Sequence, residues 1–428
     1  IVRGSAVAAI AMVAAGRDGA AALLDAAPPA PTLAGGGLGL MAQGLQASLE
    51  GEPAIACSAL LRSAGLLEAA ERSLLLPESP AALASMIAIH CGDLDVAESA
   101  VSRAIERDLG GAAFSVRHRL LSAWVSMLRG QFSRVRQVCA EIESDAAPNG
   151  LTLRDELFLR ALDLGVARRT SDAAGLVAAW KAGQDVLLRH PVDLFMLLPL
   201  GEFAVAAARL RQSERMRGLL TDAWDLLGRL GGPHVWETTL RWCSVQAAIL
   251  RNRPDEVEPH AAALLRAAAH SPLADAMAAA GRAWVHTLAG DVVPSTVEPA
   301  ARGLQEFGLS WDGSRLLAQA AAHSNDRLTI AALLQAARSL QQVDDTPRET
   351  GAAANSASAP RRSTTVLSDR EREVASLLVQ RHTYREIGER LFISPKTVEH
   401  HVARIKQRLG ASGRADLLAR LPSTMGDL

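Results

Sequence analysis

Lysine and tyrosine are almost missing from this chain of 428 residues, which has three lysines and one tyrosine. The lysines are Lys181, Lys396 and Lys406, and none of them belongs to a Gly-Lys-Ser/Thr sequence. A P-loop depends on that lysine to reach the phosphates of a nucleotide. The sequence therefore excludes a P-loop within this chain.

Cysteine is also scarce. The four cysteines are distant from one another in the sequence and form no C-x-x-C motif: Cys57, Cys91, Cys139 and Cys243. This spacing argues against a disulfide framework and against a structural zinc site. We expect buried free thiols in a reducing cytosol.

Long apolar runs are missing as well. No stretch reaches the roughly 18 consecutive apolar residues that a membrane-spanning helix needs. The apolar run at residues 6–15 has the length of a secretory signal, but it continues into a helical pattern like the rest of the chain. We therefore predict a cytoplasmic protein that does not contact a membrane.

Aromatic residues make up 4% of the chain, whereas alanine is abundant and β-branched runs are few. This composition favours helix throughout. No region alternates strands with helices, which argues against a receiver domain or a Rossmann domain. The predicted fold class is all-α.

Residues 1–340 show a recurring break in which an apolar helix ends at a small or polar turn. The central residues of the nine breaks are 35 to 41 positions apart, at Gly16, Gly51, Gly92, Gly130, Ser171, Gln212, Asn252, Gly290 and Asn325. A period of this length suits a unit of two antiparallel helices that must stack on its neighbours to bury its apolar face. The pattern predicts a curved α-superhelix that resembles tetratricopeptide arrays, although the units are longer and the full consensus is absent.

Three local features of the array carry further expectations. Prolines at 28, 29 and 31 with Gly35–Gly37 predict one exposed loop, and residues 231–234 predict a break between repeats. All seven tryptophans lie in the array, where they either fill gaps between helices or line a concave ligand surface.

The charge distribution separates the C-terminal part from the array. Residues 361–428 carry 13 Lys and Arg against 8 Asp and Glu, a net charge of +5, whereas residues 1–360 have a net charge of −6. The stretch between them is rich in small residues and contains prolines, which predicts a flexible linker. We expect a helical-repeat domain at 1–340, a linker at 341–364 and a basic module at 365–428 that contacts nucleic acid.

The basic module is predicted to contain four helices. Ser368 with Glu371 and Thr383 with Glu386 form two capping boxes that start the first two helices. Val374, Leu377, Leu378, Ile387 and Leu391 supply their buried sides. A short turn at 392–394 leads to a third helix at 394–409, and residues 414–421 form a fourth, which makes a helix-turn-helix.

The third helix has two different faces. Its apolar stripe consists of Val398, Val402, Ile405 and Leu409. The opposite face presents Lys396, His400, Ala403, Arg404 and Gln407, which suits a DNA major groove. The adjacent His400 and His401 point about 100° apart on a helix, which argues against a shared metal ion.

Residues 367–421 resemble the DNA-binding domain of LuxR/FixJ/NarL-type transcription regulators. The resemblance lies in the Leu-Ser-x-Arg-Glu run at 367–371, in Glu386-Ile387-Gly388, in residues 393–398, in His401 and in the Lys-Gln-Arg-Leu-Gly run at 406–410. It implies a module that inserts its third helix into the major groove. It also implies that the fourth helix pairs with a second copy on a palindromic site.

Carried over residue by residue, the resemblance places base reading at Glu399, His400 and Ala403. Phosphate contacts fall near Lys396, Thr397 and Lys406. The helical wheel adds Arg404 as a guanine-contacting residue and Gln407 on the same face. An acid at 399 and a small residue at 403 occupy positions that are often lysine in the family, which leaves the target sequence open.

A helical array followed by such a module also resembles the C-terminal part of large ATP-dependent regulators of the MalT type. That resemblance implies that the array receives an inducer or a protein partner and that the module works with RNA polymerase as a dimer or higher oligomer on DNA. No cofactor is expected in this chain. Because the chain has no P-loop and starts without methionine, we expect that an NTPase domain lies outside it, and ATP enters only in that case. A naturally short regulator is the alternative.

Two other functions remain as alternatives. One is a protein-interaction scaffold in which the helix-turn-helix serves for docking or dimerisation. The other is an enzyme, which the sequence disfavours because it contains no nucleophile–base pair, metal-ligand spacing or phosphate loop. Isolated residues such as His90, His234 and Asp163 are interpreted as structural.

Overall fold

The computed structural model describes most of residues 2–343 and a small part of the C-terminal region. The described ranges are 2–17, 19, 32–70, 74–146, 150–343, 375, 377–378, 382–384, 386–387, 398–399, 402 and 405–406. The chain divides into two units, Ile1–Arg348 and Glu349–Leu428. The predicted boundaries at residues 340 and 364 stay predictions, and the predicted linker beyond Val343 lies outside the described residues.

Within the described ranges every regular element is a helix and no strand occurs, which confirms the all-α prediction. The first half of the array contains α1 (Val2–Ala14), α3 (Leu33–Leu49), α4 (Pro53–Ala69), α5 (Pro80–Cys91), α6 (Leu94–Glu106), α7 (Ala112–Leu128), α8 (Phe132–Ala146), α9 (Leu153–Arg169) and α10 (Ala173–Arg189). The second half contains η1 (Leu194–Met196), α11 (Leu197–Arg209), η2 (Ser213–Met216), α12 (Arg217–Arg229), α13 (His234–Leu250), α14 (Pro254–Ala267), α15 (Pro272–Leu288), α16 (Pro294–Glu306), α17 (Ser310–His323) and α18 (Arg327–Val343).

The predicted breaks end the odd-numbered helices. Seven of the nine predicted central residues have the positive φ of a left-handed turn: Gly16, Gly51, Gly92, Gly130, Ser171, Asn252 and Gly290. In the sixth break the left-handed residue is Arg211, one position before the predicted Gln212. The ninth break ends α17 at Ser324 in an extended conformation instead.

Backbone hydrogen bonds show why these turns stop a helix. Past each left-handed residue, an N–H returns to the carbonyl five residues earlier, as from Asp93 to Ala88 O (2.9 Å) and from Asp172 to Ala167 O (2.9 Å). This bond satisfies a carbonyl that the helix leaves open and reverses the chain. The next helix then starts antiparallel to the last one.

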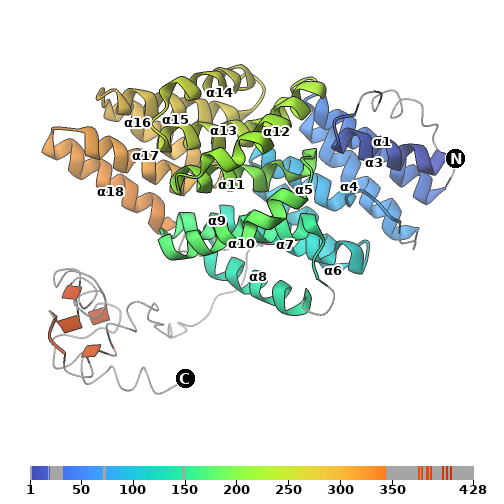
Figure 1. Ribbon diagram of the computed structural model, residues 1–428, viewed down its shortest axis with the longest axis horizontal. Coiled ribbons are helices and arrows are strands. Elements are labelled where there is room, and N and C mark those ends of the chain that lie inside the picture. The colour runs from blue at the N-terminus through green and yellow to red at the C-terminus, as the bar shows by residue number, and fades with distance from the viewer. Residues whose placement is uncertain are drawn as a thin grey trace, which may run out of the picture. The chain divides into compact units, whose positions relative to one another are not determined.

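The odd-numbered helices form the inner layer of the array and the even-numbered helices form the outer layer (Figure 1). Helices α5 and α11 are buried along almost their whole length. Helix α6 buries only the stripe of Ala97, Ala100, Val101 and Ala104. Each odd-numbered helix from α3 to α15 packs against the next odd-numbered helix, which gives the stacked core that the repeat period predicts.

The array also closes on itself, because α13 packs against α3 and α5. Trp236 of α13 is fully buried and its Nε1 donates to Ser48 Oγ of α3 at 2.9 Å. Thr239 of α13 and His90 of α5 share a hydrogen bond of 2.7 Å between Oγ1 and Nδ1. These contacts join residues about 150 to 190 positions apart along the chain.

The prediction of an exposed loop at Gly35–Gly37 is wrong. These glycines belong to α3, whose N-cap Thr32 accepts a hydrogen bond from Gly35 N at 3.1 Å, and Gly35 and Gly37 are buried. The prolines of the predicted loop lie outside the described residues. The glycines permit close approach of α4, since a Cβ at Gly37 would lie 2.7 Å from Leu67 Cδ2. The predicted break at residues 231–234 is confirmed, with positive φ at Gly231 and Gly232.

Adding a methyl group at this helix contact should destabilise the array. A Cβ at Gly44 would lie 2.7 Å from Leu60 Cγ and 3.0 Å from the carbonyl oxygen of Ala56. We expect Gly44→Ala to lower the free energy of unfolding by about 1–3 kcal/mol, because the two helices must separate. The measurement is urea denaturation followed by circular dichroism.

Gly39 supplies the matched control on the same helix, since a Cβ there meets no atom within 4 Å. Gly39→Ala should raise the free energy of unfolding by about 0.5–1 kcal/mol, because alanine restricts the unfolded chain and favours helix. Equal effects of the two substitutions would contradict the close packing of α3 and α4.

Candidate functional site

The second predicted capping box is present in the C-terminal unit. Thr383 N donates to Glu386 Oε2 at 2.8 Å, and Glu386 N donates to Thr383 Oγ1 at 3.3 Å. This reciprocal pair satisfies two backbone donors at the start of a helix. The first predicted box, Ser368 with Glu371, lies outside the described residues.

The described apolar side chains of this unit point into its interior. The fully or almost fully buried residues are Ala375, Leu378, Ile387, Val398, Val402 and Ile405. Three of them are successive members of the predicted stripe on the third helix, and Ile387 and Leu378 were also predicted. Leu377 is only partly buried. Val374, Leu391, Leu409, the turn at 392–394 and the fourth helix lie outside the described residues.

Two of the eight predicted DNA-contacting residues can be placed. Glu399 is exposed and Lys406 is partly exposed, and both lie on helical turns beside the buried stripe. Residues seven positions apart return to nearly the same side of a helix. The other six predicted contacts, Lys396, Thr397, His400, Ala403, Arg404 and Gln407, lie outside the described residues.

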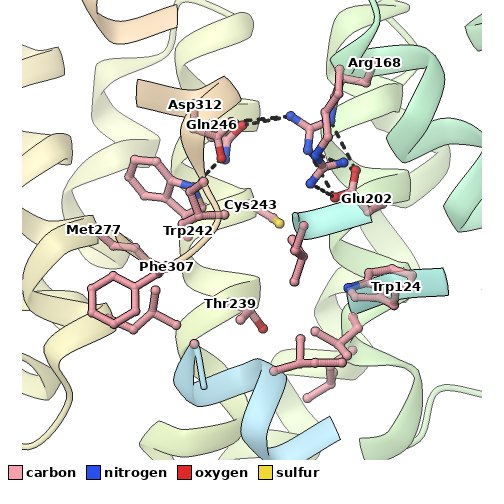
Figure 2. A pocket seen from close by; sticks show the side chains of 18 residues that line it. Trp124, Arg168, Glu202, Thr239, Trp242, Cys243, Gln246, Met277, Phe307 and Asp312 are labelled. Atoms are coloured by element: carbon pink, nitrogen blue, oxygen red, sulfur yellow. Dashed lines mark hydrogen bonds and ion pairs between the residues drawn. The ribbon is translucent and has the colours of Figure 1, made fainter. Parts of the chain in front are cut away.

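A second candidate site is a cavity inside the array. It is lined by residues of seven odd-numbered helices, α5 to α17, and of the turn after α16, and it is partly open to solvent. The space open to the centres of water molecules is about 60 Å³. Polar groups of Arg168, Glu202, Asp312 and Gln246 gather on one side, and Trp242, Met277 and Phe307 face them from other walls (Figure 2).

The polar side of the cavity is a buried ion network. Arg168 Nη2 and Nε donate to Glu202 Oε2 at 3.0 and 3.2 Å, and Arg169 Nη2 donates to Glu202 Oε1 at 2.7 Å. Burial alone would raise the pKa of Glu202, but the two guanidinium groups outweigh it and hold this pKa well below its usual range. Glu202 is therefore ionised and fully paired.

Asp312 extends the network from α17. Trp242 Nε1 and Gln246 Nε2 each donate to Asp312 Oδ2 at 3.2 Å. Arg168 Nη1 lies 3.6 Å from Asp312 Oδ1, and the Arg168 guanidinium lies 4.7 Å from the Trp311 ring centroid. No sequence motif indicated these residues, because they come from separate helices.

The buried tryptophans fill gaps between helices, as one of the two interpretations from the sequence expects, whereas a ligand-stacking role stays a prediction. Trp124 and Trp242 line the cavity, whereas Trp236 fills the contact between α13 and α3. The four cysteines are free thiols, and burial raises the pKa of each of them above its ordinary value. Among the described residues, no group of three or more His, Cys, Asp or Glu could hold a metal ion.

Three buried histidines make stability depend on pH. Burial lowers the pKa of His90 to about 3, and burial together with Arg117 and Arg241 lowers those of His118 and His260 to about 4. Each is neutral in the folded array but takes up a proton on unfolding below its unfolded pKa of about 6.5. Above pH 6.5 these histidines therefore do not oppose folding. As pH falls from 6.5 towards 4, proton uptake by the unfolded chain lowers the free energy of unfolding.

We expect His90→Asn to flatten the dependence of unfolding free energy on pH by about 1.4 kcal/mol per pH unit near pH 5, which corresponds to one proton. The measurement is urea denaturation at a series of pH values between 4.5 and 7. Burial raises the pKa of Asp163 to about 6, so this residue makes the free energy of unfolding fall as pH rises. It does so equally in the unaltered chain and in His90→Asn. An unchanged slope would show that His90 is not held neutral.

No helix in the described part of the chain is long and apolar enough to cross a membrane. Comparison with solved structures found no match. Comparison with protein families matches residues 365–421 to the bacterial regulatory proteins of the luxR family.

Two characterised proteins are similar to the C-terminal part of the chain. Spore germination protein GerE of Bacillus subtilis (strain 168) is 48% identical over 63 residues, which are 15% of this chain and 84% of GerE. Oxygen regulatory protein NreC of Staphylococcus carnosus (strain TM300) is 38% identical over 76 residues, which are 18% of this chain and only 34% of NreC. Because the match covers most of GerE, this chain belongs to the luxR family of bacterial regulatory proteins.

Proposed function

We propose that this chain is a cytoplasmic transcription regulator whose C-terminal module reads promoter DNA and whose helical array senses an effector. The observation that carries the DNA-binding part is the luxR-family match at residues 365–421, together with the buried stripe of Val398, Val402 and Ile405. Burial of that stripe turns the opposite side of the helix outward, where polar and basic side chains suit a major groove.

The proposed contacts divide into two groups. Glu399, His400, Ala403, Arg404 and Gln407 face base edges, and Lys396, Thr397 and Lys406 contact phosphates. Base contacts set the sequence preference, whereas phosphate contacts set the register and the salt dependence. We further propose that the module acts as a dimer or higher oligomer with RNA polymerase.

The sensing role rests on the architecture of the array. Its inner layer encloses a partly open cavity with a paired ion network and aromatic walls. Small-molecule sites are commonly concave and mostly apolar with a few placed polar groups. That this chain corresponds to the C-terminal part of a larger regulator with an NTPase domain is likewise a proposal.

Arg404→Ala in the full chain should weaken binding to a promoter fragment about 10- to 100-fold, the loss of about 1–3 kcal/mol expected for a bidentate guanine contact. Lys406→Ala should weaken binding to all DNA sequences alike and reduce the slope of log K against log salt by about one. Fluorescence anisotropy at several salt concentrations measures both.

Arg134→Ala is the matched control, because Arg134 is an exposed arginine on α8 of the array. It should leave affinity and salt slope unchanged. Binding that is insensitive to salt and to Arg404→Ala would sink the DNA-reading proposal. Genomic occupancy without sequence-enriched sites would favour an interaction scaffold instead.

A further inference from the structure

The charged side chains that line the array cavity are already paired with one another. Glu202 Oε1 accepts from Arg169 Nη2 at 2.7 Å, and Glu202 Oε2 accepts from Arg168 Nη2 at 3.0 Å. Arg168 Nη1 donates to Gln246 Oε1 at 3.4 Å. Arg169 Nη1 donates to the carbonyl oxygen of Gly165 at 3.1 Å. The hydrogen bonds of these groups are therefore directed at the wall itself rather than at an occupant.

Asp312 offers no acceptor to the cavity. Its Oδ2 accepts from Trp242 Nε1 and from Gln246 Nε2, each at 3.2 Å. Its Oδ1 is fully buried and lies 3.6 Å from Arg168 Nη1. A molecule in the cavity therefore does not reach this oxygen.

Thr239 and Cys243 complete the polar lining. Thr239 Oγ1 shares a hydrogen bond of 2.7 Å with His90 Nδ1. Burial raises the pKa of the Cys243 thiol to about 12, so this group is neutral and only a weak donor. A polar group on an occupant would give up its hydrogen bonds to water without gaining an equivalent one from the wall, which is unfavourable.

The charges around the cavity do not favour an ion inside it. Arg209 and Arg315 lie close enough to Arg168 to leave this region with a surplus of positive charge, which disfavours a cation. Neither Arg209 nor Arg315 lines the cavity. An anion would therefore lose its water without meeting a free donor, and burial of an ion without such a partner is strongly unfavourable.

The rest of the wall is apolar. Ile89, Trp124, Leu197, Met277 and Phe307 line it and are supplied by α5, α7, α11, α15 and the turn after α16 (Figure 2). One water occupies roughly 10–15 Å³ of the space open to water centres, so about 60 Å³ holds several waters or one small organic molecule. An apolar molecule that replaces these waters would remove its own surface and that of the wall from water.

We propose that this cavity binds a small, uncharged, apolar molecule of the size of one aromatic ring, which is held by contact with the aromatic and aliphatic side chains alone. The assignment rests on the proposed function in one respect: it makes the cavity the effector site of the array. Residues of all seven odd-numbered helices from α5 to α17 line the cavity, so an occupant adds apolar contacts between helices that are distant in the sequence.

Three probes of similar size test the ligand class on the full chain without DNA: benzene, phenol and benzoate. Isothermal titration should show that benzene binds at least ten times more tightly than phenol, whose hydroxyl group finds no partner, and that benzoate binds more weakly than phenol. A smaller preference for benzene over phenol, tighter binding of benzoate than of phenol, or no binding of benzene would overturn the proposal.

Cys243→Phe ties the binding to this cavity. The larger side chain should occupy the cavity and lower the affinity for benzene at least tenfold. Ala64→Phe is the matched control, because Ala64 lines a second cavity of about 60 Å³ beside α4 and α5. This control should leave the affinity unchanged. Loss of binding in Ala64→Phe but not in Cys243→Phe would place benzene in the second cavity and contradict the assignment.

Leu309→Trp, at a partly exposed position of the same wall, replaces Cys243→Phe if that variant does not fold. It should weaken the binding of benzene in the same way. A chain that binds promoter DNA but not benzene overturns this inference alone, whereas one that binds benzene but no DNA contradicts the proposed function.

Discussion

Trp236→Ala is expected to lower the free energy of unfolding of the array by about 3–5 kcal/mol, the cost of removing a fully buried tryptophan from a core. The Trp236 side chain packs against His90 and Phe195, with ring centroids 5.2 and 6.1 Å away. Its Nε1 also donates to Ser48 Oγ, which is itself fully buried. The measurement is urea denaturation followed by circular dichroism.

Trp236→Phe separates packing from hydrogen bonding. Phenylalanine retains most of the apolar contact but leaves Ser48 without this donor, so about 1–3 kcal/mol should be lost. Trp224→Ala is the control, because Trp224 is partly exposed and packs at the surface against Arg241, with 4.1 Å between guanidinium and ring centroid. A loss from Trp236→Ala no larger than that from Trp224→Ala would show that α13 does not close onto α3 in solution.

This closure marks the limit of what the sequence predicts about the array. The breaks at Gly92 and Ser171 were predictable, since a left-handed turn and its returning hydrogen bond involve only residues within one helix end. The pairing of Trp236 with Ser48 joins residues 188 positions apart, and repeat periodicity carries no signal about how tightly successive units wind.

The glycines of α3 show a different reason for failure. A run of three glycines ordinarily indicates a turn, because glycine is permissive and weakens helices. Here the missing side chains permit α4 to approach, and Ser63 Oγ donates to the carbonyl oxygen of Gly37 at 2.7 Å. Tertiary packing thus outweighs local preference, which sequence reasoning about one segment does not reveal.

The two candidate sites differ in how far the sequence predicts them. The stripe of Val398, Val402 and Ile405 follows helical periodicity, so its burial could be predicted from one short segment. The cavity residues Arg168, Glu202 and Asp312 belong to three helices and share no spacing. The available signal was a charged residue inside an apolar helix, as with Glu202 in α11, but that signal does not identify the partner.

Glu202→Leu should lower the free energy of unfolding by about 3–5 kcal/mol, because it leaves two buried guanidinium groups without their shared carboxylate. The side chains of Arg168, Arg169 and Glu202 are 2%, 7% and 6% exposed, so solvent cannot replace the lost partner. Arg168→Met in the Glu202→Leu background should recover part of the loss, since it removes one of the two guanidinium groups that have lost Glu202. The costs of the two substitutions should therefore not add, as expected for residues in one network.

Arg217→Ala supplies the control, because the Arg217–Glu214 pair is 73% and 75% exposed and should contribute less than about 1 kcal/mol. The measurement is urea denaturation of the unaltered chain, the two single variants Glu202→Leu and Arg168→Met, their double variant and Arg217→Ala. The free energies of unfolding show whether the costs of the two substitutions add. Strict additivity, or a loss from Glu202→Leu as small as that from Arg217→Ala, would show that the cavity wall is hydrated and that these charges do not hold the inner helices together.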